Sequence, residues 1–222
     1  MLGVLFNAAT IAVGGLIGLL ANKHMPKKLA DLLLIANGFC AIYIGIKGSL
    51  SGENALITVL SMSIGAIIGY LLKLDDRVNN GARKIEKKFT KDGEEGGFAK
   101  GFSAASILFC VGAMAIVGSI QASFGDNSVL MTKGIMDGVT AAVLASTLGY
   151  GVIFSSIPII IYQGAIVLLA PYIAPEYCLN EMTCAGSIVV AIIGLNMVGV
   201  TKVKVMDLMP AMFVPILLCL FM

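Results

Sequence analysis

The chain contains 222 residues, of which 58% are hydrophobic and only 13% are charged. Soluble domains carry about a quarter of charged residues, so this composition excludes a water-soluble enzyme and predicts a polytopic membrane protein. The formal net charge is only +2 and the basic residues lie beside acidic ones, so no nucleic-acid partner is expected.

Membrane-spanning helices are expected wherever about 20 apolar residues follow one another. The uncharged runs predict an all-α polytopic membrane protein with about eight transmembrane helices. These runs cover 1–22, 32–46, 54–72, 101–125, 138–175, 182–201 and 208–222. The run 138–175 is too long for one crossing, and Gly149-Tyr150-Gly151 divides it into two helices.

The distribution of lysine and arginine predicts the orientation, because these residues accumulate in cytoplasmic loops. If the N-terminus lies outside, every basic residue except Lys47 and Lys133 falls in a predicted inner loop. The sequence therefore predicts that both termini face outward.

The only long aqueous segment is the arm at 74–100, which has the pattern of an amphipathic helix. Its apolar positions are Leu74, Val78, Ala82, Ile85 and Phe89. The basic residues between them are Arg83, Lys84, Lys87 and Lys88. Such a helix is expected to lie on the inner leaflet with its basic side chains near anionic headgroups. A solvated, charged linker is the alternative.

An internal repeat organises the chain into a single transmembrane domain with four parts. Residues of the first three predicted helices match those of the last three at an offset of 148 or 149, as in Gly15 with Gly164 and Gly45 with Gly194. The two units begin five membrane crossings apart. Because five is an odd number, the second unit runs through the membrane in the opposite direction to the first, as in many secondary transporters. A chance match of common residues is the alternative. The parts are repeat one (1–73), the arm (74–100), central helices (101–151) and repeat two (152–222).

The central helices contain the densest polar residues, namely Gln121, Asp126, Lys133 and Asp137. Lys133 and Asp137 are four positions apart and therefore share one helix face. A charge inside a membrane is costly and usually belongs to a solute or ion pathway. The alternative is a lysine that reaches the surface and an aspartate that starts a helix there.

Gln163 falls near the middle of a predicted helix, where an unpaired amide is costly. It requires a neighbour, a water or a solute, and a hydrogen bond that serves only packing is equally compatible with the sequence. Secondary candidates of the same kind are Asn7, Asn37, Ser155 and Asn196.

Enzymatic motifs are missing from the sequence. It has no Cys-x-x-Cys, no paired histidines and no phosphate-binding Gly-Lys-Ser/Thr, so no catalytic residue, metal or cofactor is expected.

Several stretches carry a resemblance to a known family. They are 109–121, Gly125-Asp126, 133–138, 149–155 and Tyr162-Gln163-Gly164. In these stretches the chain resembles the bacterial YdfK/YqgA-type family of uncharacterised integral inner-membrane proteins, a domain-of-unknown-function family. The resemblance implies a multi-pass protein of the bacterial cytoplasmic membrane, and it implies no activity.

Two functions fit these features. The first is a membrane transporter or channel for a small solute or ion, in which Gln121, Asp126, Lys133, Asp137 and Gln163 line the pathway. The alternative is a non-transporting membrane scaffold or sensor that acts through the 74–100 arm. The expected partners are the lipid bilayer and a small solute or ion, and a homo-oligomer is compatible with either function.

Overall fold

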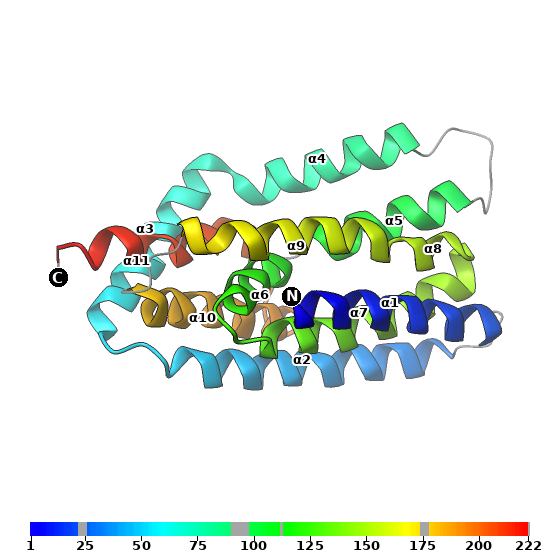
Figure 1. Ribbon diagram of the computed structural model, residues 1–222, viewed down its shortest axis with the longest axis horizontal. Coiled ribbons are helices and arrows are strands. Elements are labelled where there is room, and N and C mark those ends of the chain that lie inside the picture. Colours follow the sequence, from blue (N-terminus) through cyan, green and yellow to red (C-terminus); the bar gives the residue numbers. More distant parts are fainter. Residues whose placement is uncertain (22–25, 90–97, 112, 174–177, 222) are drawn as a thin grey trace.

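The computed structural model describes residues 1–21, 26–89, 98–111, 113–173 and 178–221, and in these ranges it contains helices and no strand. Most of the long helices run along the long axis of the molecule (Figure 1). The elements in chain order are α1 (Leu2–Ala21), α2 (Lys27–Ser49), α3 (Ala55–Leu72), α4 (Leu74–Phe89), α5 (Phe98–Val111), α6 (Ala113–Ser123), α7 (Ser128–Leu148), α8 (Gly151–Phe154), α9 (Ser156–Ile173), α10 (Leu179–Met197), the 3₁₀ helix η2 (Val205–Met212) and α11 (Val214–Leu218).

The predicted all-helical polytopic architecture is confirmed, but the helix count differs from the expected eight. Among the described residues, six helices are long and apolar enough to span a membrane, and α5 with α6, bent by 58°, makes a seventh. The expected last helix at 208–222 is instead the 3₁₀ helix η2 followed by the short α11. Pro210 lies inside η2 and Pro215 in the first turn of α11. Each proline removes a backbone donor and so prevents one continuous α-helix.

The central helix α7 begins at Ser128, ten residues before the uncharged run at 138. Asp126 stabilises the turn just before this helix, because its Oδ1 accepts a hydrogen bond from the Ser128 amide at 2.9 Å. Lys133 and Asp137 therefore lie within the helix, although the uncharged run that predicted this helix begins only at 138. A search for uncharged runs begins such a helix too late, because it does not recognise that the two charges neutralise each other.

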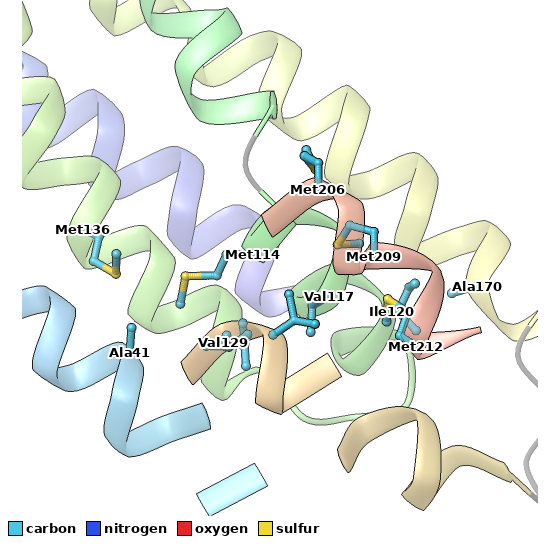
Figure 2. Close-up of a cluster of buried hydrophobic side chains, with 12 residues drawn as sticks. Ala41, Met114, Val117, Ile120, Val129, Met136, Ala170, Met206, Met209 and Met212 are labelled. Carbon is cyan, nitrogen blue, oxygen red and sulfur yellow. The ribbon is translucent and has the colours of Figure 1, made fainter. Parts of the chain in front are cut away.

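A methionine-rich core lies between the helices (Figure 2). It includes Met114 of α6, Met136 of α7 and three methionines of η2. Methionine is unbranched and flexible, so its side chain fills the irregular gaps that a 3₁₀ helix leaves beside α-helices. The apolar side of η2 is thereby buried although η2 is not a regular spanning helix.

Small residues bring the long helices into close contact, as is typical of membrane proteins. The α1 and α7 helices lie parallel, and a Cβ atom at Gly14 or Gly18 of α1 would overlap the carbonyl oxygen of Gly138 or Ala142 of α7. The α2 and α10 helices lie antiparallel, with Gly45 of α2 directly against the backbone of α10. At these positions only glycine permits the observed approach.

The amphipathic helix expected in the arm forms over α4 and lies alongside α5 (Figure 1). Residues 90–97 are outside the described residues, as are the side chains of Arg83, Lys87 and Lys88, whereas Lys84 is exposed. Positions 98–100 of the predicted arm belong to α5. Val78 packs against the methionine-rich core, so the arm is attached to the bundle at its beginning.

Two polar contacts also attach α4 to the segment before and within η2. The Asp75 amide donates to Asp207 Oδ1 at 2.9 Å, and Lys204 Nζ donates to Asp76 Oδ1 at 2.7 Å. The hydrogen bond and charge of Lys204 hold the pKa of Asp76 below its usual 3.8, and Asp76 raises the pKa of Lys204 above 10.5. The pair therefore stays fully charged between these values. The contribution of this pair to folding stability is lost only as the pH falls through the lowered pKa of Asp76 or rises through the raised pKa of Lys204.

The α1–α7 contact predicts opposite effects for two glycine-to-alanine substitutions. Gly14→Ala forces the two helices apart and is expected to lower stability by about 1–3 kcal/mol, the usual cost of overpacking. Gly81→Ala on α4 is the matched control, because nothing lies within 4 Å of its Cβ position and alanine favours a helix. The measurement is the Tm of the purified protein in detergent by circular dichroism. A Gly14→Ala protein that melts at or above the wild-type temperature would contradict this packing.

Candidate functional site

The more buried of the two ion pairs in the described part of the chain lies on α7. The side chains of Lys133 and Asp137 form an ion pair and are only 5% and 13% exposed. Lys133 Nζ also lies 5.9 Å from the centre of the Phe109 ring on α5, where the ring face attracts a cation. The two charges therefore stabilise each other one helical turn apart in an apolar interior.

Two amide side chains complete this group. Asn7 of α1 donates from Nδ2 to Oε1 of Gln163 on α9 at 3.2 Å, and both residues are fully buried. The Asn7 side chain also lies next to the Asp137 carboxylate. Gln163 thus has a neighbour, as its position near the middle of a helix requires. We call Asn7, Lys133, Asp137 and Gln163 the inner polar cluster.

The position of α1 brings these residues together. The amino end of α1 lies in the middle of the molecule (Figure 1), where the Met1 side chain faces Gly164 of α9. On the other side, a Cβ atom at Gly134 of α7 would lie 3.0 Å from Asn7 Cα and from the Phe6 ring. Glycine at this position lets α1 approach α7 closely enough for Asn7 to contact both Asp137 and Gln163.

The inner polar cluster has unused hydrogen-bonding capacity. Asn7 Oδ1 and Gln163 Nε2 are buried, and neither has a partner among the described residues. Buried polar atoms are nearly always paired with protein, water or a ligand. One free acceptor and one free donor beside an ion pair provide the chemistry to bind a small polar molecule or an ion with its water.

The other two principal candidates, Gln121 and Asp126, lie in a separate cavity of about 520 Å³ between α2, α6, α7 and α10. Gln121 donates from Nε2 to Ser187 Oγ on α10 at 3.1 Å, whereas Asp126 lies exposed at the α6–α7 turn. We call this cavity the polar cleft. Its lining consists of Tyr43, Ile44, Lys47, Gly48, Ser51, Gln121, Asp126, Ser128, Val129, Thr132, Thr183 and Ser187.

The secondary candidates lie in neither the polar cleft nor the inner polar cluster, except for Asn7. Asn196 holds the loop after α10, where its Oδ1 accepts from Thr201 Oγ1 at 2.6 Å and from the Val203 amide at 3.0 Å. Ser155 is buried and donates to the Val152 carbonyl at 2.6 Å, where α8 meets α9. Asn37 lies on α2, and its buried Nδ2 has no partner among the described residues.

Sequence reasoning missed the contribution of α2 and α10 to the polar cleft, because single hydroxyl residues in apolar helices give no distinctive pattern. It also missed Glu181, which is only 6% exposed at the start of α10. Glu181 Oε1 accepts from the amides of Glu53 and Asn54, each at 2.8 Å. This buried carboxylate fixes the α2–α3 loop against α10, and an acidic residue that begins an apolar segment was the available signal.

Comparisons with known proteins agree on one family. A family model described as "Protein of unknown function (DUF554)" matches residues 2–220. The chain is 32% identical to "Uncharacterized membrane protein YdfK" of Bacillus subtilis (strain 168), over 97% of this chain and 94% of that protein. It is 27% identical to "Uncharacterized protein YqgA" of Escherichia coli (strain K12), over 96% and 93%. No solved structure matches the chain.

The resemblance expected from the sequence is therefore confirmed. The name of the Bacillus protein and the apolar helices together identify a multi-pass membrane protein. This agrees with the predicted location in the bacterial cytoplasmic membrane.

The buried ion pair predicts a specific pattern of stability. Removing one partner leaves an uncompensated buried charge, so Lys133→Met or Asp137→Asn is expected to cost about 3–5 kcal/mol. The double variant Lys133→Met/Asp137→Leu removes both charges and is expected to be more stable than the single variants. Asp76→Asn is the matched control, because Asp76 is paired but exposed. The measurement is the Tm in detergent, and a double variant that loses as much as the two single variants together would contradict a mutually neutralised pair.

Proposed function

We propose that this chain, which belongs to the DUF554 family of proteins of unknown function, moves a small polar solute or ion across the membrane. The observation that carries this proposal is the inner polar cluster, which places a buried ion pair beside two amide atoms that lack partners. A helix bundle held together by glycine and methionine contacts does not need these groups for packing. Charges retained inside a membrane mark solute and ion pathways.

Asp137 and Lys133 have different roles in this proposal. Lys133 attracts an anionic group of the solute, and Asp137 holds that lysine or carries a coupling proton or cation. Asn7 and Gln163 supply the free acceptor and donor that orient the solute. The pathway is built mainly by α1, α7 and α9.

The inverted repeat that this proposal includes makes α2 and α10 equivalent helices that run in opposite directions. The structure packs these two helices antiparallel, with Gly45 against Ala191 and Gly38 against Met197. This arrangement is compatible with an inverted repeat, and solute sites form where such repeats meet.

The proposed orientation places the polar cleft on the outer side. The cleft lies at the carboxyl end of α2 and the amino end of α7, which face outward if the lysine-rich loops face the cytoplasm. A solute then enters from the cleft and reaches the inner polar cluster along α7.

Uptake by the purified protein in liposomes tests the proposal. The probes are small carboxylates, amino acids and monovalent cations under imposed proton and sodium gradients. At least one probe is expected to accumulate faster than in protein-free liposomes, and Asp137→Asn is expected to abolish this uptake. Asp76→Asn is the matched control, because Asp76 belongs to an exposed ion pair with Lys204 outside the inner polar cluster. This variant is expected to retain uptake. Equal uptake by wild type and Asp137→Asn would exclude the inner polar cluster from the pathway.

The strongly amphipathic α4 favours the second candidate function, a membrane scaffold or sensor. Replacing Arg83, Lys84, Lys87 and Lys88 by Gln separates the two functions. A carrier retains its uptake, because α4 lies outside the inner polar cluster. A scaffold instead shows no uptake with any probe and loses protease protection of the arm in anionic liposomes, but not in neutral ones.

A further inference from the structure

The polar cleft has the properties of a binding site in its own right. Its volume of about 520 Å³ lies within the range of small-molecule sites. Four helices contribute to it, and most of its side chains carry hydroxyl, amide or charged groups. These groups offer a polar occupant several hydrogen-bond partners.

Two opposite charges line the cleft without pairing with each other. Lys47 comes from α2 and Asp126 from the α6–α7 turn, and both are exposed. Within the described part of the chain, neither takes part in an ion pair. Asp126 uses Oδ1 to accept from the Ser128 amide, so its charge remains available to a ligand.

The buried side of the cleft contains a polar atom that lacks a partner. Gln121 is only 3% exposed, and its Nε2 is used by the hydrogen bond to Ser187. Its Oε1 is buried and has no partner in the described residues. This oxygen accepts hydrogen bonds, so it provides a place for a donor group of a ligand.

We propose that the polar cleft binds a small zwitterion of the α-amino acid class. The ligand carboxylate pairs with Lys47, and the ammonium group pairs with Asp126. An N–H or O–H group of the ligand donates a hydrogen bond to the free Gln121 Oε1. The role of the cleft as an outer entry site rests on the proposed transport function. Binding of the ligand to the cleft does not require transport.

The two charges together select this class of ligand. An anion is attracted by Lys47 but repelled by Asp126. A cation is attracted by Asp126 but repelled by Lys47. A neutral polyol can form hydrogen bonds with both side chains, but it offers neither of them an opposite charge. Only a ligand that carries both signs forms an ion pair with both residues.

Calorimetry on the full chain in detergent tests this inference. The probes are glycine, L-alanine and L-serine, with propionate, propylamine and glycerol as analogues that lack one or both charges. At least one amino acid is expected to bind about tenfold or more tightly than each analogue, as expected for one additional charge-assisted hydrogen bond.

The variants assign the binding to the cleft. Lys47→Met and Asp126→Asn are each expected to weaken binding about tenfold. Asparagine still accepts from the Ser128 amide, so Asp126→Asn removes the charge without removing the turn before the helix. Lys202→Met is the matched control, because Lys202 is an exposed lysine outside the cleft, and it is expected to bind like the wild type.

The outcomes separate this inference from the proposed function. Amino-acid binding that Lys47→Met and Asp126→Asn weaken, without any uptake, supports the cleft and contradicts the transport proposal. Uptake of some probe without amino-acid binding supports transport and overturns the cleft as a zwitterion site. Propionate binding as tight as that of the amino acids, or binding unchanged in both variants, also overturns it.

Discussion

The close approach of α1 to α7 determines the arrangement of the polar interior. Gly14 and Gly18 place α1 against the α7 backbone, and Gly134 leaves room for the α1 backbone at Asn7. Only at this separation does the Asn7 side chain contact both Gln163 and Asp137. Small residues at a helix interface are usually explained by packing alone. Here they also bring the polar groups of three helices together.

The same helix connects the two polar regions. Ser128 and Thr132 on the first turns of α7 line the polar cleft, and Lys133 and Asp137 follow directly on the same helix. The cleft has an opening to solvent and two separate charges, whereas the inner polar cluster is enclosed and its charges neutralise each other. This difference is expected, because a charge far from solvent in an apolar environment needs a partner of opposite sign.

The apolar helices, the amphipathic α4 and the shared face of Lys133 and Asp137 could all be predicted from the sequence, since each depends on local spacing. The true start of α7 could not, because its two charges resemble a loop until their pairing is known. Pro210 and Pro215 interrupt a regular α-helix, but the choice of a 3₁₀ helix depends on packing against the methionine-rich core. Gln121 and Asp126 lie in a different site from Gln163 because of tertiary contacts. No sequence pattern around these residues indicates this separation.

The central claim is that the inner polar cluster serves transport and is not needed for folding. The most direct test measures uptake in liposomes by Lys133→Met/Asp137→Leu, with circular dichroism on the same preparation. If the cluster lines the pathway, this double variant has the helix content and cooperative melting of the wild type but no uptake above protein-free liposomes. Wild-type uptake by a folded double variant would contradict the account, because the buried charges would then have no part in moving the solute.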